Sequence, residues 1–269
     1  GIRAVGRRPV YTVPLPVQVP RCSPNVTRAS LRLPPGFMFL FIFDFFSIVE
    51  RKNPTGVIKA FARAFRPGEG PILVIKTING DWKLNDLEKV RAVAAERPDI
   101  LIIDKYYSAE EKSSLLGLCD CYVSLHRSEG FGLTMAEAMS LGKPVVATGY
   151  SGNLDFMTPE NSYLVDYVRG TVPPGCEPYT EGSPWAEPSL DQAAEYMRRV
   201  YESQQEAARK GELAREDILT RHNVQTVGVV LKQRLDEIQA SRQRVAAGAP
   251  ARRTEVDFRP VADPVSEPI

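Results

Sequence analysis

The sequence predicts an α/β protein in which a parallel sheet carries helices on both faces. From residue 37 to residue 165, short apolar runs alternate with longer segments that have helical periodicity. One apolar run ends in a turn with two glycines, and the run after the next helix begins with a proline. Repeated units of this length imply parallel strands joined by right-handed crossovers. Ligands bind such sheets beyond the carboxyl ends of the strands, so the residues after each strand are the candidates for a site.

The alternation sets the expected boundaries of each element. Pro54 suits the first position of a helix, Ser108 is an expected N-cap, and Gly142 is a good C-terminal glycine. We expect strands at 37–43, 72–76, 100–104, 121–125, 144–148 and 162–165. The expected helices are 54–65, 85–96, 109–118, 133–142, 189–203, 205–221 and 223–240.

Three segments fall outside this alternation. Residues 1–36 are rich in proline and predict an extended linker that leads into a domain at 37–240. Residues 170–188 are rich in proline and glycine, and predict either a lid over the site or a packed surface loop. Residues 241–269 are rich in Ala, Arg and Pro and are expected to be disordered. The chain begins with Gly1 rather than methionine, which suggests a fragment.

The composition is that of an ordinary globular protein. The 269 residues are 43% hydrophobic and 25% charged, and the net charge of +1 argues against a nucleic acid as partner. The two histidines argue against a His-based metal centre, and the four cysteines have neither metal nor disulfide spacing. Reduced thiols in a cytoplasmic protein are therefore expected. The most apolar run, 37–43, is far too short to span a bilayer.

The central stretch, residues 125–148, combines the end of a strand with a glycine loop, a helix and a further strand. Gly130 and Gly132 let the backbone turn tightly and approach a ligand. The free N–H groups at the start of the helix that follows form an anion site. Glu129 lies in the loop and Glu137 in the helix. A carboxylate therefore stands on each side of the expected anion site.

This stretch resembles the donor-binding half of retaining GT-B glycosyltransferases of family 4, the glycosyl transferases group 1. The resemblance rests on the spacing of the two glutamates, on Gly-Phe-Gly after the first, on Glu-Ala-Met at the second, and on Gly-Lys-Pro-Val-Val-Ala-Thr after the helix. It extends over roughly residues 37–235. It implies a Rossmann-like parallel sheet, the donor half of a GT-B fold, which binds a nucleotide sugar without a metal ion or other cofactor.

The resemblance also implies a reaction and a second binding partner. The reaction transfers a hexosyl group, mannosyl being one option, from a GDP- or UDP-sugar, as in polysaccharide biosynthesis. The acceptor, a glycan or lipid, would be bound by a missing N-terminal domain. We therefore expect this chain to be the donor-binding half of an enzyme.

The residues after the first strand have two interpretations. On spacing alone, Arg51 and Lys52 form a solvated basic turn. With the resemblance they form a clamp for the donor's diphosphate, since Arg binds phosphate in a bidentate way and Lys as a point charge. Lys52 aligns with the phosphate-binding lysine of the family. The family's usual arginine falls on Ser47, which leaves open whether Arg51 takes its place. We expect Arg51, Lys52 and Glu129 to carry the chemistry.

The resemblance assigns roles to the central loop and helix. Backbone N–H groups of Phe131, Gly132 and Leu133 would face the diphosphate and stabilise charge on the departing nucleotide. Glu129 would accept hydrogen bonds from the sugar, and Glu137 from both ribose hydroxyls. Without the resemblance, Glu129 is a charge that complements the helix dipole, and Glu137 is an exposed helical residue.

Two other loops supply candidates. Lys105 and Tyr106 would contact the nucleotide base, the alternative being tyrosines that only cover the edge of the sheet. Ser151 and Gly152 match the small-residue loop near the donor. His126 either orients the sugar or plugs the top of the sheet.

Other classes of function remain as alternatives. A nucleotide-sugar binding module without transfer activity would have the same site. A glycoside hydrolase would aim both carboxylates at one anomeric centre, whereas a loop and a helix point these two at different ends of a nucleotide. A dinucleotide oxidoreductase ranks low because no G-x-G-x-x-G follows the first strand.

Overall fold

The computed structural model describes residues 11–246 of the chain. The described residues fall into two compact units, with the boundary between residues 227 and 228. The first unit contains the sheet and its helices. The described part of the second unit belongs to helix α9 (Val224–Ala246).

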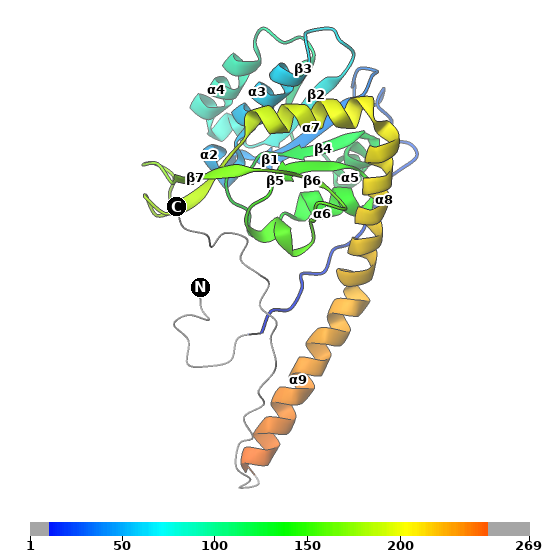
Figure 1. Ribbon diagram of the computed structural model, residues 1–269, viewed down its shortest axis with the longest axis vertical. Coiled ribbons are helices and arrows are strands. Elements are labelled where there is room, and N and C mark those ends of the chain that lie inside the picture. Colours follow the sequence, from blue (N-terminus) through cyan, green and yellow to red (C-terminus); the bar gives the residue numbers. More distant parts are fainter. Residues whose placement is uncertain (1–10, 247–269) are drawn as a thin grey trace. The chain divides into compact units, whose positions relative to one another are not determined.

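The first unit is built on a six-stranded parallel sheet in the order β3-β2-β1-β4-β5-β6 (Figure 1). The predicted fold class, a Rossmann-like parallel sheet with helices on both faces, is confirmed. The chain adds strands outward from β1 to β3 and then returns to the other side of β1, so the order reverses between β1 and β4. The strands are β1 (Met38–Asp44), β2 (Ile72–Ile78), β3 (Ile100–Asp104), β4 (Cys121–Ser124), β5 (Val145–Thr148) and β6 (Tyr163–Val165).

Helices cover both faces of the sheet. α3, α4 and α7 lie on one face, and α5 and α6 lie on the other (Figure 1). Helix α8 packs along α6. The bounds are α3 (Pro54–Ala64), α4 (Leu84–Ala94), α5 (Ala109–Leu118), α6 (Leu133–Ser140), α7 (Leu190–Glu202) and α8 (Gln204–Arg221).

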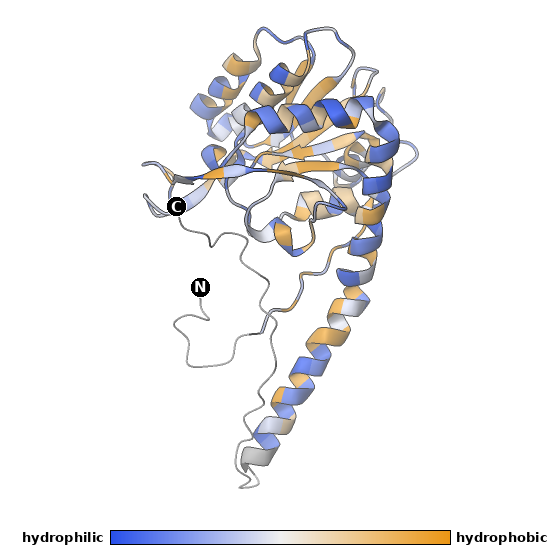
Figure 2. Cartoon of the chain, in the orientation of Figure 1, coloured by the Kyte–Doolittle hydropathy of each residue, from blue (hydrophilic) through white to orange (hydrophobic). Residues whose placement is uncertain are grey.

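The sequence folds in this way because its central strands are apolar on both faces. In β1 both faces are buried, and Met38, Phe39 and Leu40 have no exposed surface. Figure 2 shows the strands of the sheet in orange and the helices in a mixture of orange and blue. Helix α7 has this two-sided character, because it buries Met197 and Val200 and leaves polar residues outside.

The helix ends follow the predicted signals. Pro54 begins α3, and Ser108 forms a complete capping box with Glu111 at the start of α5. Helix α6 ends at Ser140, two residues before Gly142, which has a φ of +73°. Glycine adopts this left-handed conformation without strain, so the chain can turn into β5.

The segment predicted as an insertion is a β-hairpin rather than an irregular loop. Strand β7 (Tyr167–Thr171) pairs antiparallel with β8 (Pro184–Pro188). Both prolines of β8 stand at the ends of the strand, where a missing N–H is tolerated. A short helix that the sequence did not suggest, α2 (Val49–Lys52), follows β1 and a single 3₁₀ turn.

The two ends of the predicted domain also differ from expectation. Residues 11–36 contain neither helix nor strand, but Val17, Leu31 and Leu33 are buried in the main core. This segment is therefore packed against the sheet domain rather than free of it. Helix α9 continues to Ala246, so residues 241–246, predicted as disordered, are helical. The predictions for residues 1–10 and 247–269 lie outside the described residues.

None of the helices among the described residues combines the length and the apolar character that crossing a membrane requires.

Candidate functional site

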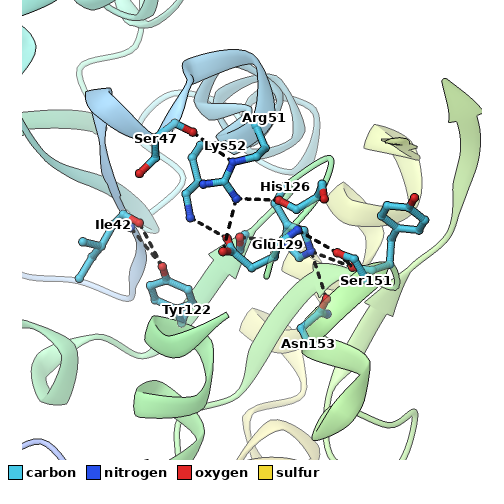
Figure 3. A network of polar contacts seen from close by, with 12 residues as sticks. Ile42, Ser47, Arg51, Lys52, Tyr122, His126, Glu129, Ser151 and Asn153 are labelled. Carbon is cyan, nitrogen blue, oxygen red and sulfur yellow. Dashed lines mark hydrogen bonds and ion pairs between the residues drawn. The ribbon is translucent and has the colours of Figure 1, made fainter. Parts of the chain in front are cut away.

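A half-buried ion pair lies where the order of the strands reverses. The Nζ of Lys52, from the helix after β1, lies 2.6 Å from Oε2 of Glu129, from the loop after β4 (Figure 3). Their side chains are 17% and 14% exposed. The sequence placed these two residues in separate loops, and the fold brings them together at the carboxyl ends of neighbouring strands.

Arg51 takes part in the same cluster but is turned inward. Its guanidinium donates to the carbonyl oxygens of Ser47 and Ser128, at 3.1 Å and 2.9 Å, and lies 3.4 Å from the other oxygen of Glu129 (Figure 3). Arg51 is 8% exposed. It therefore holds the two loops and the carboxylate in place, whereas Lys52 is the cation that reaches the open side.

The charges in this cluster influence each other. Burial raises the pKa of the Glu129 carboxyl, but Lys52 and Arg51 outweigh burial and hold this pKa below its ordinary value. Burial lowers the pKa of the Lys52 ammonium, against the opposite effect of Glu129. Lys52 and Glu129 are therefore both charged in a site that is partly shielded from water. An incoming anion would compete with Glu129 for Lys52.

Two unusual backbone conformations frame α2. Ile48, just before α2, has a φ of +61°, and Asn53, just after it, has a φ of +55°. Asparagine tolerates this region, and the Asn53 side chain both accepts from the Gly56 N–H and donates to the Leu125 carbonyl. A β-branched residue such as Ile48 is strained there. These conformations hold α2 in the orientation that presents Arg51 and Lys52 to the loop after β4.

The glycine loop after β4 packs against the 3₁₀ turn at Ser151–Asp155. The Ser151 hydroxyl accepts from the Glu129 N–H at 2.8 Å, and the Gly152 N–H donates to the Glu129 carbonyl at 3.0 Å. A Cβ on Gly152 would lie 2.1 Å from the Gly130 carbonyl oxygen, so this close approach requires glycine. Ser151 and Gly152 therefore shape the loop that carries Glu129.

Gly132 occupies the N-cap position of α6, with a φ of +93°. Because glycine has no side chain, it offers no capping group to the first N–H groups of α6. The Phe131 ring packs against Phe156 and His222, with centroids 4.9 Å and 5.9 Å away, and so anchors the loop. The amides of the first turn of α6 are thus left to face an anion.

Two adjoining pockets lie at this end of the sheet. One, of about 130 Å³, is lined by Lys52, Glu129, Tyr122 and the first turn of α6, including Gly132 and Leu133. The other, of about 310 Å³, extends from Lys52 toward the ends of β2 and β3. Among the described residues that line them, Ile42, Lys52 and Thr134 belong to both. The second pocket also contains Asp44, Ser47, Lys76, Thr77, Tyr106, Tyr107 and Lys112.

Glu137 faces α5 from one turn into α6. Its Oε2 lies 3.4 Å from Nζ of Lys112 but makes no hydrogen bond within the described residues. The side chain is 16% exposed. A buried carboxylate oxygen without a hydrogen bond is costly, and a donor from a ligand would relieve that cost. Glu137 stands beside Lys112, which lines the second pocket.

Of the two candidates in the loop after β3, one lines the second pocket. Tyr106 lines the second pocket and donates its hydroxyl hydrogen to Asn79 Oδ1. Lys105 is absent from the described lining, and its ammonium lies over the Tyr107 ring, 4.9 Å from the centroid. Its carbonyl oxygen accepts from the buried ammonium of Lys76.

Lys76 and Tyr107 are lining residues that sequence reasoning missed. A lysine within the apolar run of β2 was the one available signal, because a charge in a buried strand needs a reason. Lys76 is 3% exposed, and its ammonium lies 4.7 Å from the centroid of the Tyr107 ring.

His126 supports the site from behind, and it is not among the described residues that line either pocket. It has no exposed surface, and its Nε2 faces two acceptors, the Tyr150 carbonyl and Asn153 Oδ1 (Figure 3). Nε2 must therefore carry the hydrogen, and Nδ1 accepts from the Ser124 hydroxyl. Burial lowers the pKa of His126, so the ring stays neutral at pH 7 and fastens β4 to the turn at Ser151.

Within residues 11–246, no three His, Cys, Asp or Glu side chains are grouped in a way that could hold a metal ion.

The fold and the site together define a Rossmann-like domain with its crevice at the point where the strand order reverses. Residues 41–172 match the family described as "Glycosyl transferases group 1". This segment of the chain is thus similar to the glycosyl transferases group 1. None of the curated proteins matches the sequence.

Solved structures share the fold. Anabaena Alr3699/HepE, solved in complex with UDP and glucose, is 17% identical over 78% of this chain and 51% of its own, with a TM-score of 0.61. Sucrose-phosphate synthase from Thermosynechococcus elongatus is 19% identical over 79% of this chain and 48% of its own, with a TM-score of 0.60. The chain thus spans about half the length of these proteins.

One similar structure is a domain of comparable extent. The C-terminal domain of the glycosyl transferase group 1 family protein LpcC from Francisella tularensis is 20% identical, with a TM-score of 0.57. The match covers 78% of this chain and 99% of that domain.

Proposed function

We propose that this chain is the nucleotide-sugar-binding half of a retaining glycosyltransferase of family 4. The observation that carries the proposal is the meeting of Lys52, Glu129 and the first turn of α6 in one pocket at the strand reversal. A cation and free amide N–H groups there suit a diphosphate, and a carboxylate beside them suits sugar hydroxyls.

The proposed chemistry is stabilisation of a leaving group. Breaking the bond between the sugar and the diphosphate leaves negative charge on the departing nucleotide. Lys52 and the amides of Phe131, Gly132 and Leu133 would stabilise that charge, and would do so more strongly as it develops. Arg51 would act by holding Glu129 and its loop, and Ser47 lines the adjoining pocket toward the nucleoside. The residues named here act without a metal ion.

The second pocket would hold the nucleoside. Glu137 would accept hydrogen bonds from the ribose hydroxyls. Tyr106 and Tyr107 would pack against the base. The nucleotide would be UDP or GDP and the transferred group a hexosyl. A second domain would bind a glycan or lipid acceptor, and the match of this chain to only about half the length of similar solved proteins supports this part of the proposal. The free cysteines among the described residues agree with a cytoplasmic location.

The test is a binding screen on the 269-residue chain. We expect UDP, GDP or one of their sugar conjugates to raise the melting temperature and to bind in titration calorimetry, with weak affinity because the crevice has one wall. Transfer to an acceptor should require the longer protein. Failure of all nucleoside diphosphates to bind would overturn the proposal, and binding without transfer by the longer protein would favour a module without transfer activity.

A further inference from the structure

The β7–β8 hairpin is attached to the site but mostly lies outside the residues that match the family. The match ends at residue 172, directly after β7, so the connection and β8 lie beyond it. The hairpin has a small core of its own, formed by Val172, Cys176 and Trp185, which are all buried. It is thus a folded structure and not a loose connection.

Arg127 fastens the hairpin to the site. Its carbonyl accepts from the Ala186 N–H of β8, and its own N–H donates to the Arg51 carbonyl, both at 2.8 Å. Its guanidinium donates to Glu187 of β8 and to the Glu50 carbonyl of α2, and lies 5.1 Å from the ring centre of Trp185. The hairpin, α2 and the loop that carries Glu129 are therefore held by one residue.

The hairpin also supports the strained residue before α2. Ile48, with its φ of +61°, packs its side chain against the hairpin core. A strained conformation of this kind persists only where the surrounding packing holds it. The hairpin core is therefore part of what keeps α2, and with it Arg51 and Lys52, in position.

The connection between the two strands places an aromatic ring on Arg51. The guanidinium carbon of Arg51 lies 5.7 Å from the centre of the Tyr179 ring, and Tyr179 is 39% exposed. The same guanidinium group also contacts the Glu129 carboxylate and the Ser128 carbonyl. Among the described residues, none from the hairpin lines the pocket formed by Lys52, Glu129 and the first turn of α6. The contact between Tyr179 and Arg51 therefore connects the hairpin to Glu129, and not to the first turn of α6.

We propose that the β7–β8 hairpin positions the carboxylate that faces the sugar, with Tyr179 as a positioning residue that holds Arg51 against Glu129. The inference rests on the proposed function and assigns the diphosphate and the sugar to different elements of the site. Lys52 and the first turn of α6 hold the diphosphate. The hairpin fixes the carboxylate that faces the sugar. Removing the Tyr179 ring, which contacts Arg51 and leaves the hairpin core in place, therefore changes affinity for the sugar conjugate and leaves affinity for the bare nucleotide unchanged.

The experiment compares three variants of the 269-residue chain by titration calorimetry. Tyr179→Ala removes the ring, Tyr179→Phe keeps it, and Val168→Ala changes an exposed residue of the same hairpin as a control. The probes are UDP and UDP-glucose, or GDP and GDP-mannose if the wild type prefers guanine. Tyr179→Ala should weaken the sugar conjugate by about threefold to tenfold, and the bare nucleotide by less than about twofold. Tyr179→Phe and Val168→Ala should match the wild type.

The outcomes separate this inference from the proposed function. If the wild type binds none of the probes, the proposed function fails and the inference fails with it. If the wild type binds but Tyr179→Ala lowers both affinities equally, or neither, only the role of the hairpin is overturned. A loss in Tyr179→Phe equal to that in Tyr179→Ala would also overturn it, because the ring over Arg51 is then not what matters. Circular dichroism of each variant checks that the fold is intact.

Discussion

Lys52 and Glu129 form an ion pair of 2.6 Å that joins the segment after β1 to the loop after β4. These two strands are neighbours in the sheet although about 80 residues of sequence separate them. The pair lines a pocket together with the start of α6. The ion pair therefore links Lys52, whose charge suits a phosphate, to Glu129, whose carboxylate suits the hydroxyls of a sugar.

Lys52→Met should weaken nucleoside diphosphates far more than nucleosides. The substitution keeps an unbranched side chain of similar length and removes its charge. A hydrogen bond to a charged group contributes about 1.5–3 kcal/mol, which corresponds to a loss of roughly tenfold to a hundredfold. Titration with UDP and with uridine measures both effects. Lys89→Met, in an exposed pair on α4, is the matched control and should change neither affinity. Equal losses for UDP and uridine would show that Lys52 does not touch phosphate.

Glu137→Gln should reduce the preference for ribose over deoxyribose. The buried Oε2 of Glu137 lacks a hydrogen bond, and a ribose hydroxyl would supply one. Wild type should bind UDP about tenfold more tightly than its 2′-deoxy form, and the variant should show a smaller ratio. The ratio is the useful quantity, because a general loosening of α6 would lower both affinities alike. An unchanged ratio would remove Glu137 from the ribose site.

Gly152→Ala should impair both the loop and the fold. The new Cβ would lie 2.1 Å from the Gly130 carbonyl oxygen and 2.8 Å from the Phe131 nitrogen, and both are backbone atoms that cannot turn aside. Overpacking of this kind costs about 1–3 kcal/mol, and here the strain falls on the anion loop. Urea unfolding should show the loss of stability, and nucleotide binding should weaken with it. Gly228→Ala, where a Cβ meets no atom within 4 Å, is the control. Full nucleotide affinity in Gly152→Ala would contradict the assigned role of this contact.

The sheet and the glycine loop were predictable because their signals are local. The apolar run of β1 and the glycines around Phe131 fix conformation within a few residues. The inward turn of Arg51 was not predictable, since it depends on the left-handed conformation of Ile48 and on a hairpin more than a hundred residues away.

The hairpin and the second pocket were missed for related reasons. The hairpin strands are separated by a long connection and β8 is bounded by prolines, so neither a tight turn nor a clear alternation marks them. In the sequence, Lys76 is only a charged residue at the end of an apolar run. Tertiary packing is what buries it and gives its ammonium two carbonyl acceptors.

Lys76 should make the stability of the fold depend on pH in the alkaline range. Its ammonium donates to the Thr77 carbonyl at 2.7 Å and to the Lys105 carbonyl. Burial lowers its pKa to about 8, against the opposing effect of Asp104. In the unfolded chain the pKa is near the ordinary value of about 10.4. Between these two values the unfolded chain binds more protons than the folded one, so the free energy of unfolding rises with pH.

Lys76→Met isolates this effect, because methionine does not titrate. The difference in the free energy of unfolding, wild type minus variant, should be constant below pH 7 and should increase from about pH 8 to pH 10. The slope is at most about 1.4 kcal/mol per pH unit. Urea denaturation at pH 7, 8, 9 and 10 measures it, and the variant also loses two hydrogen bonds, which shifts the whole curve without changing its slope. A difference that stays flat up to pH 10 would mean that Lys76 keeps an ordinary pKa in the folded protein and is more hydrated than its burial indicates.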